Sequence, residues 1–352
     1  MAGVRQHILP RFLLKGFASR LEAQEVFTWV FRKGGNVFEA NIKNVAVEKH
    51  FYTQPANTSV DDEITELERG FARLLDNLRN ENDGFKITDP IVPEFVSHLT
   101  SRTKHLRDSF IETTGDMTQI LSDYLADERN VRSWLFEYYK RHPEVVKKAI
   151  DDALVKMQLP RYQRRALRER LQRLISVERL MDQMDGDIQQ YAVMFSMLAP
   201  TLIQKLPTLV KDGHIQALAK SLIAEPRAEK YRQLKWYVCK SRTPLILGDV
   251  GCLFDVVGEK RLRSLGGTNE DIRTAYVPIA SDCLLLGTAA DGIPDLNFST
   301  INEYFASYSR DFFVSCESTE KTGALLKLLG TKSQVFSDSE LELMIKEVIS
   351  ES

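Results

Sequence analysis

The chain has 352 residues, 43% of them apolar, and its formal net charge at pH 7 is −2. This length and apolar content allow two or three ordinary domains, or one large domain, with a sizeable core. A net charge so close to zero argues against a protein that binds polyanions over its whole surface, although it leaves room for a local basic groove.

The cysteines lie in the last third of the chain, and each one sits in an apolar run; they are Cys239, Cys252, Cys283 and Cys316. No two of them have the C-x-x-C spacing of a zinc knuckle or a redox site. We therefore expect buried thiols in a reducing cytosol rather than disulfides or metal ligands.

The first residues lack the charged and apolar regions of a signal peptide. The longest apolar stretch, 191–206, is interrupted by Pro200 and Lys205 and falls short of the ~20 apolar residues of a membrane span. We therefore expect a cytoplasmic protein that has no membrane contact.

The opening stretch, residues 5–17, contains a histidine, a proline, three basic residues and two phenylalanines. Chain ends usually fray, but His7 precedes Pro10 by three residues and a Leu/Phe-rich run follows. This composition predicts an end that is anchored in the fold.

A β-hairpin is predicted next. Residues 25–31 are rich in β-branched and aromatic side chains, residues 34–36 (Gly-Gly-Asn) have turn chemistry, and residues 37–40 form the return strand. A compact segment over 44–52 follows and ends in an aromatic pair.

Apolar residues at spacings of three and four predict a helix over 59–78 and a second helix from Asp89-Pro90 to Phe110. The pattern stays helical from Asp116 to about Leu222. We expect interruptions at the proline and glycine positions of this block, which are His142-Pro143, Leu159-Pro160, Asp185-Gly186, Ala199-Pro200, Leu206-Pro207 and Asp212-Gly213.

Beyond residue 225 the pattern changes to short apolar or alternating runs that are typical of strands. The predicted strands cover 234–240, 244–249, 251–257, 276–279, 283–287 and 311–316. Short helices are predicted near 299–305, 319–329 and 338–348. Strands at both ends and helices in the middle predict an α+β fold in which N- and C-terminal strands share a sheet beside a large central helical block. The predicted segments are 1–58, 59–225 and 226–352.

His7 is the first candidate for chemistry, since an imidazole suits acid–base work near neutral pH. A structural histidine that bonds to the backbone is the alternative. Arg102 follows in a predicted helix, at the edge of its apolar stripe. An arginine in such a place pairs with a carboxylate or holds an anion such as phosphate.

His98, Arg102 and His105 share one face of that helix. Two histidines there could suggest a metal, but the i, i+4 histidine pair of a zincin is missing and an arginine lies between them. A solvated or ion-paired helix face explains the pattern more simply, and we predict no metal site.

Asp249 ends an apolar strand between two glycines, where a functional acid or an ordinary turn residue is common. Asn302 lies in the first turn of a short helix, where it could bind a ligand or cap the helix. The stretch 161–174 carries six arginines against one acid. With its leucines on the buried side, Arg164 and Arg168 could follow a nucleic-acid backbone, or the arginines could form a solvated face.

The common cofactor and hydrolase motifs are absent: we find no G-x-x-x-x-G-K-[ST] loop, no G-x-G-x-x-G after a strand, no H-E-x-x-H and no G-x-S-x-G. ATPases, Rossmann dehydrogenases, zincins and α/β-hydrolases are therefore not expected. There is no nucleotide-cofactor motif, and the sequence leaves open whether Mg²⁺ takes part.

The pattern His7-x-x-Pro10-x-x-x-Leu14-x-x-Phe17 resembles the start of the mostly bacterial DUF4238 family of proteins of unknown function. The order of further motifs is similar over nearly the whole chain: the hairpin 25–40, the segment 44–52, a glutamate in the next helix (Glu63 or Glu68), Arg102-Thr103, 245–249, 276–278 and Asn302. The second residue of the motif is Ile8 where the family has Tyr, and Gly248-Asp249-Val250-Gly251 replaces the usual Ser-Asp-Asn/Thr-Pro.

The resemblance brings no settled activity, but it implies that His7, Arg102, Asp249 and Asn302 belong together. We expect a site in which His7 acts as acid or base, Asp249 orients it, Arg102 holds an anionic group and Asn302 positions the substrate. Such a set suits phosphodiester cleavage or phosphoryl and nucleotidyl chemistry.

A nuclease-like effector of a bacterial defence or toxin system is the concrete hypothesis, with RNA or DNA held by the arginine-rich helix. The alternative is a non-catalytic module that senses a ligand or binds a partner, and a structural subunit of a larger complex is a third class. The oligomeric state is left open.

Overall fold

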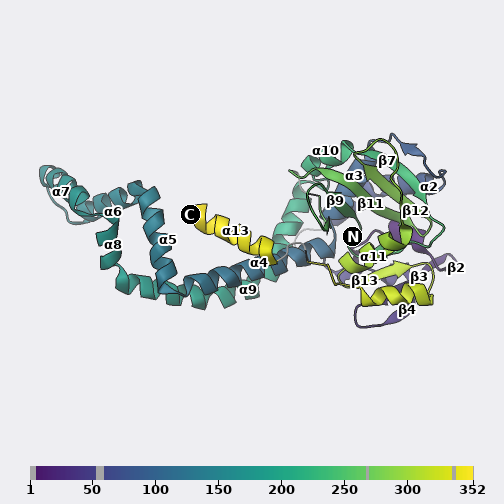
Figure 1. Cartoon of the computed structure of the whole chain (residues 1–352), viewed down its shortest axis with the longest axis horizontal. Helices are drawn as coiled ribbons and strands as arrows, with labels where there is room; N and C mark the ends of the chain where they lie inside the picture. The colour runs from purple at the N-terminus through teal and green to yellow at the C-terminus, as the bar shows by residue number, and fades with distance from the viewer. Residues whose placement is uncertain (1–4, 53–58, 267–268, 335–337, 352) are drawn as a thin grey trace. The chain divides into compact units, whose positions relative to one another are not determined.

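The computed structural model describes residues 5–52, 59–266, 269–334 and 338–351, of which 59–61, 172–173, 338–339 and 348–351 are described by their backbone only. The contacts within the chain divide it into two units (Figure 1). Unit 1 consists of Met1–Phe110 and Thr208–Val335, and unit 2 of Ile111–Pro207 and Phe336–Ser352.

The α+β class is confirmed, and strands from both ends of the chain share a sheet in unit 1. In that sheet β13 (Phe312–Ser315) pairs antiparallel with β3 (Glu25–Arg32), so that Val314 lies opposite Val30. The strand order is β2–β3–β13–β8, and β4 pairs with β3. The other strands are β2 (Arg20–Glu22), β4 (Val37–Asn41) and β8 (Leu247–Gly248).

The predicted hairpin is the β3–β4 pair of this sheet, with Phe31 opposite Val37. Gly34 and Gly35 form its turn with φ of 94° and 90°, a conformation that glycine adopts without strain. The alternating, β-branched sequence therefore predicted both strands and the turn between them.

A second antiparallel sheet of unit 1 has the order β10–β9–β11–β12–β7–β6. Its strands are β6 (Lys86–Ile87), β7 (Lys235–Lys240), β9 (Leu253–Val256), β10 (Leu262–Arg263), β11 (Ile272–Ala280) and β12 (Cys283–Thr288). A third, two-stranded sheet joins β1 (Arg5–His7) to β5 (Val47–Lys49).

The helices of unit 1 pack on these sheets around one continuous apolar core. Helices α1 and α2 contact β11, α10 packs on α3, and α11 contacts β8 and β13. Their bounds are α1 (Arg11–Leu14), η1 (Lys15–Phe17), η2 (Ile42–Asn44), α2 (Ser59–Arg79), α3 (Ile91–Ser101), α10 (Glu225–Arg232), α11 (Phe298–Tyr308), α12 (Glu320–Ala324) and η3 (Leu325–Lys327). Helices α2 and α3 thus share a unit with the sheets, although the sequence grouped them with the helical block.

The single helix predicted from Asp89 to Phe110 is wrong. It is two helices, α3 and α4 (Lys104–Leu125), and Arg102 is the C-cap of α3 rather than a mid-helix residue. The guanidinium of Arg102 is fixed by contacts with residues outside its own helix. Helical periodicity in the sequence cannot reveal such contacts.

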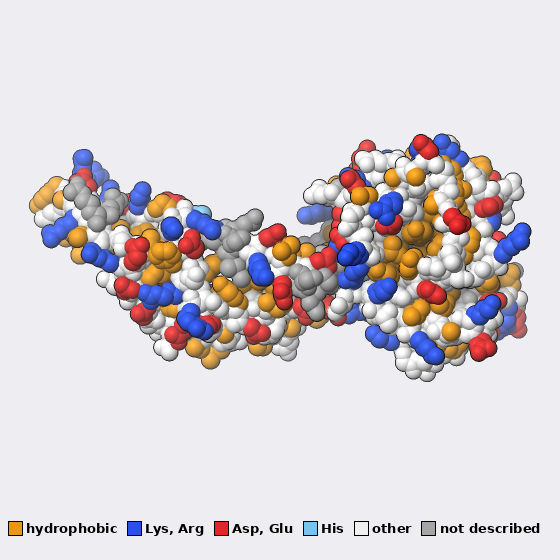
Figure 2. Space-filling view, viewed as in Figure 1, with side chains coloured by type: hydrophobic (Ala, Val, Ile, Leu, Met, Phe, Trp, Pro, Cys, Tyr) orange, Lys and Arg blue, Asp and Glu red, His pale blue; other side chains and the backbone are white. Residues whose placement is uncertain are grey.

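Unit 2 is helical and contains α5 (Glu128–Arg141), α6 (Pro143–Lys156), α7 (Arg161–Leu174), α8 (Val177–Gln183) and α13 (Asp338–Glu351), with the adjoining parts of α4 and α9 (Asp185–Lys220). Its core is small and includes Val131, Leu135, Met181, Ile188 and Ala192. Hydrophobic side chains also reach its surface among the charged ones (Figure 2).

Three predicted helix breaks of this region are confirmed: at His142 before α6, around Pro160 before α7, and beside Asp185, where Met184 separates α8 from α9. The breaks predicted at Pro200, Pro207 and Gly213 are wrong, because α9 is continuous through all three. Both prolines are exposed, so water can satisfy the carbonyls whose helical donor each proline removes. By length and composition alone, α9 is apolar enough to cross a membrane, because one 18-residue window within it has a mean hydropathy of 1.3.

All four cysteines are free thiols; Cys239, Cys252 and Cys283 are buried and Cys316 is partly buried. Burial is the main cause that raises the pKa of Cys283 to about 11 and that of Cys239 to about 12. The prediction of buried thiols is confirmed for these three residues.

Candidate functional site

The opening stretch is anchored, as predicted, and it forms one wall of a cleft in unit 1. Strand β1 pairs with β5, which places His7 opposite Val47, and the amide of Ile8 donates to Ala46 O at 2.8 Å. Pro10 is the N-cap of α1, and its carbonyl accepts the amides of Leu13 and Leu14. Both leucines are fully buried.

Because Leu13 and Leu14 point into the core, Arg11 of α1 and Lys15 at the start of η1, four residues apart, share the exposed side of this helical segment. The helix is held from behind by Arg79 of α2, whose Nη2 donates to Phe12 O and Ile279 O, both at 2.8 Å. Gly16 O accepts the amide of Ser281 at 2.8 Å, which ties the end of α1 to the second sheet.

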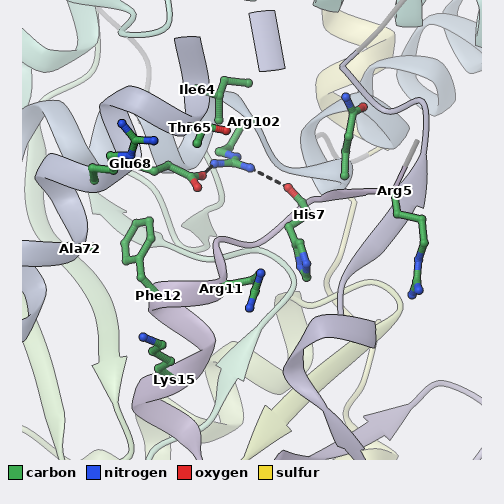
Figure 3. Close-up of a pocket in the computed structure, with 12 residues that line it drawn as sticks. Arg5, His7, Arg11, Phe12, Lys15, Ile64, Thr65, Glu68, Ala72 and Arg102 are labelled. Carbon is green, nitrogen blue, oxygen red and sulfur yellow. Dashed lines mark hydrogen bonds and ion pairs between the residues drawn. The ribbon is translucent and has the colours of Figure 1, made fainter. Parts of the chain in front are cut away.

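The cleft between β1, α1 and α2 has a volume of about 420 Å³ (Figure 3). Its lining is strongly basic, with five cationic side chains and one carboxylate. The lining residues are Arg5, Gln6, His7, Arg11, Phe12, Lys15, Ile64, Thr65, Glu68, Arg69, Ala72 and Arg102.

Arg102 is 2% exposed and uses its guanidinium to hold the cleft together. Nη2 donates to His7 O at 2.6 Å, Nε donates to the Tyr52 hydroxyl at 3.0 Å, and Nη1 forms an ion pair with Glu68 (Figure 3). Tyr52 in turn donates to Arg102 O at 2.9 Å. The charge of Arg102 is therefore neutralised by Glu68, and its donors are engaged by the protein itself.

His98 completes this network on the inner side of Arg102. Burial lowers the pKa of His98 to about 4, so its ring is neutral at pH 7. Nδ1 lies 2.9 Å from Leu222 O and acts as the donor, which leaves Nε2 to face Nη1 of Arg102 at 3.4 Å. His98 is thus a structural acceptor rather than a metal ligand, and no group of His, Cys, Asp and Glu suited to a metal occurs among the described residues.

The remaining cations of the cleft differ in how far they are neutralised. Arg69 pairs with Glu66 on the exposed side of α2. Arg5 donates to the neutral Asn44 side chain at 2.9 Å, and within the described part of the chain Arg5, Arg11 and Lys15 form no ion pair. These three side chains give the cleft its uncompensated positive charge.

His7 lies among these cations, with its ring beside Arg11 (Figure 3). Burial first, and then the charges of Arg11, Arg102 and Arg5, lower the pKa of His7 to about 4, against a hydrogen bond with the backbone of Val45 that raises it. Its Nδ1 is buried and has no hydrogen-bond partner among the described residues. The imidazole is therefore neutral at pH 7 and has an unused polar atom.

Asp249 lies outside the lining of this cleft, and its carboxylate is engaged by backbone amides. It accepts the amide of Arg310 at 2.8 Å on Oδ1, and those of Asp311 and Phe312 at 2.6 and 3.1 Å on Oδ2. Burial raises the pKa of Asp249 to about 6, and the three amides act in the opposite direction. These contacts fasten the end of β8 to the start of β13 and supply no hydrogen bond to His7.

Asn302 likewise serves the backbone. Its Oδ1 accepts the amide of Ile246 at 3.0 Å and its Nδ2 donates to Pro244 O at 2.8 Å, which fixes the segment that leads into β8. Of the four residues that the family resemblance groups together, His7 and Arg102 meet in the cleft. Asp249 and Asn302 each brace β8 and its neighbours.

Arg164 and Arg168 lie on α7 in unit 2. Arg168 forms an ion pair with Asp151 of α6, and Arg164 is partly buried with an Nε that has no partner among the described residues. Tyr162 beside them is 73% exposed. A nucleic-acid contact of this helix stays a prediction.

The motifs do not predict Arg5, Arg11 and Lys15 as site residues. The sequence does contain a feature that could have indicated them: three cations lie in its first fifteen residues and no acid precedes Glu22. Their convergence with Glu68 and Arg102 depends on the packing of α2 and α3 against the opening stretch, which is a tertiary property.

The fold and the cleft define an α+β protein with a basic pocket at its N-terminal motif. The chain belongs to the family described as "Protein of unknown function (DUF4238)", whose model matches residues 5–307. No curated protein and no solved structure matches it.

Proposed function

We propose that the cleft of unit 1 binds a phosphate group of a nucleotide or of a nucleic-acid strand. The observation that carries this proposal is the set of three cations, Arg5, Arg11 and Lys15, that line the cleft without a carboxylate partner among the described residues. Uncompensated positive charge in a concave site attracts anions, and phosphate is an anion that both arginine and lysine bind well.

The dimensions of the cleft agree with this proposal. Its volume of about 420 Å³ falls within the range of about 300–1,000 Å³ that small-molecule sites occupy. Phe12, Ile64 and Ala72 add an apolar side to the basic one. An anionic group joined to a flat or apolar group, as in a nucleotide, would satisfy both sides of the cleft.

A titration of the full chain tests the proposal, with inorganic phosphate and adenosine monophosphate as ligands and calorimetry as the readout. We expect Arg11→Gln and Lys15→Gln to weaken adenosine monophosphate binding about tenfold each. Lys321→Gln is the matched control, because Lys321 is an exposed lysine of unit 1 outside the cleft lining. Equal affinities of all three variants and the wild type, or no binding by any of them, would contradict the proposal.

Phosphodiester cleavage is the second candidate, and His7 is the observation that favours it. A neutral imidazole beside cations can accept the proton of an attacking water while Arg5, Arg11 and Lys15 stabilise the negative charge on the phosphate oxygens. The new P–O bond forms as the bond to the leaving oxygen breaks, and solvent supplies the proton that the leaving oxygen takes. A nuclease-like effector of a bacterial defence or toxin system would use this chemistry.

The test of this candidate is a cleavage assay with labelled RNA, single-stranded DNA and duplex DNA, with and without Mg²⁺. Wild-type cleavage that is lost in a folded His7→Gln protein would support a catalytic His7. Binding of adenosine monophosphate by both proteins without cleavage of any strand would instead favour a ligand-sensing module. Equal cleavage by both proteins would place the reaction elsewhere.

A further inference from the structure

Helix α9 presents an uncharged surface in unit 2 that only partly packs within that unit. Between Asp187 and Lys205 its sequence has no charged residue. One side of this segment is buried, through Ile188, Ala192 and Ala199. Other sides of the helix remain exposed although they are rich in apolar residues.

The exposed side includes Tyr191, Met194, Leu198 and Leu202, which are 38–49% exposed. Their spacings of three and four residues place them on one face, which we name the α9 stripe. Single exposed apolar residues are common on protein surfaces, but this stripe is continuous over three helical turns. Continuous exposed apolar patches mark interaction sites.

The α9 stripe has an acid at one end and a base at the other. Asp187 lies four residues before Tyr191 and Lys205 lies three residues after Leu202, so both continue the same face. Both are exposed, and neither forms an ion pair within the described residues. By contrast, the nearby Asp182 and Asp185 both pair with Arg132.

The two charges are also arranged symmetrically. Ser196 lies halfway between Asp187 and Lys205, and it lies halfway between Met194 and Leu198 as well. If two α9 helices lie antiparallel across a twofold axis at the level of Ser196, Asp187 of each copy meets Lys205 of the other. Met194 then meets Leu198 at the centre, and the same surface serves both copies, as a twofold interface requires.

We propose that two copies of this chain associate through the α9 stripes, antiparallel, with Asp187–Lys205 ion pairs at both ends. The occupant of the stripe is a second copy because the charges on the stripe complement themselves under that rotation.

Charge reversal tests the pairing in the full chain, with sedimentation velocity over a concentration series as the readout. Asp187→Lys and Lys205→Asp each place like charges opposite one another at both ends, and each should weaken the dimer roughly tenfold or more. The double reversal, Asp187→Lys with Lys205→Asp, restores opposite charges and should return the dissociation constant to within about threefold of the wild type. A double variant that is no better than the single variants would overturn the antiparallel register.

A second pair of variants tests the stripe itself. Leu198→Glu puts a charge at its centre and should give a monomer at every concentration examined. Val193→Glu is the matched control, because Val193 is 48% exposed on the same helix but lies about 200° around it from Tyr191. It should leave the dimer intact, and circular dichroism should show both variants folded.

Two outcomes would reject a second copy as the occupant. One is a wild-type protein that is monomeric at all concentrations, and the other is a dimer that Leu198→Glu does not affect. Flotation of the wild type with phosphatidylcholine vesicles, lost in Leu198→Glu, would assign the stripe to a lipid surface instead.

Discussion

Nη2 of Arg102 donates to the carbonyl oxygen of His7 at 2.6 Å, so a buried guanidinium at the end of α3 fixes the backbone of the histidine that faces the cleft. The same guanidinium pairs with Glu68 of α2. Arg102 therefore joins β1, α2 and α3, the elements from which the cleft is built. Its function in the free protein is to position His7, and the charges left for a ligand are those of Arg5, Arg11 and Lys15.

Glu68 is the carboxylate of the cleft lining, and we predict that its removal strengthens phosphate binding while it weakens the fold. Glu68→Gln should raise the affinity for phosphate roughly threefold to tenfold, because the net charge of the cleft becomes more positive. The fold should lose about 1–3 kcal/mol of unfolding free energy, because Arg102 is buried and loses its counter-charge.

Calorimetric titration and urea denaturation measure the two effects separately. Glu303→Gln is the control, since Glu303 is an exposed glutamate of α11 that does not line the cleft and forms no ion pair among the described residues. It should change neither quantity by more than about 0.5 kcal/mol. A loss of phosphate affinity in folded Glu68→Gln would mean that Glu68 contacts the ligand directly.

Four histidines, two buried and two partly buried, should make the fold sensitive to acid. Burial lowers the pKa of His7, His98, His105 and His214 to about 4, below the ordinary value of 6.5. Between pH 6.5 and 4 the unfolded chain binds more protons at these sites than the folded chain, so stability falls as the pH falls through this window.

Asp249 has the opposite effect on stability, because its pKa is raised to about 6 from the ordinary value of 3.8. Between these values the folded chain binds more protons at this carboxyl than the unfolded chain, which adds stability as the pH falls. With four histidines against one carboxyl, we expect a net loss of roughly 2 kcal/mol or more between pH 7 and pH 4.5. Urea unfolding at a series of pH values measures it, and His7→Gln should flatten the profile. A stability that stays constant or rises toward pH 4.5 would contradict the burial of these rings.

The local parts of the fold were predictable, and the parts that depend on distant contacts were not. The alternation of residues 25–31 and the glycines at 34 and 35 are enough to define the β3–β4 hairpin. By contrast, an interior proline ends most helices, but Pro200 does not end α9. Whether a helix continues through a proline depends on whether that side of the helix faces water, which the local sequence does not tell.

The same distinction applies to the site. His7 and Arg102 were recognisable as unusual residues, and the structure brings both into the cleft. The pairing of Arg102 with Glu68 and the backbone role of Asp249 depend on which elements pack together. Residue type and motif order carry no information on that choice.

Asp249 should matter for stability rather than for ligand binding. Asp249→Ala leaves the amides of Arg310, Asp311 and Phe312 without their acceptor in a partly buried turn, which should cost about 3 kcal/mol. Asp291→Ala is the control, because that carboxylate is 96% exposed and should change stability by less than about 0.5 kcal/mol. Thermal unfolding gives the comparison. A folded Asp249→Ala protein with normal stability but no phosphate binding would return Asp249 to the functional site.

Gly16 is a position at which the opening stretch lies close against the second sheet. A Cβ at Gly16 would lie 2.1 Å from the carbonyl oxygen of Ile279, a backbone atom that cannot swing aside. Gly16→Ala should therefore lower the unfolding free energy by about 1–3 kcal/mol.

Because Arg11 and Lys15 lie in the α1–η1 segment that would be displaced, the same variant should also weaken phosphate binding. Gly70→Ala in α2 is the matched substitution, since a Cβ there meets nothing within 4 Å and alanine favours the helix. Its stability should stay equal or rise by up to about 1 kcal/mol. If Gly16→Ala proves as stable as Gly70→Ala, α1 does not pack against β11 as closely as described, and the wall of the cleft must be placed differently.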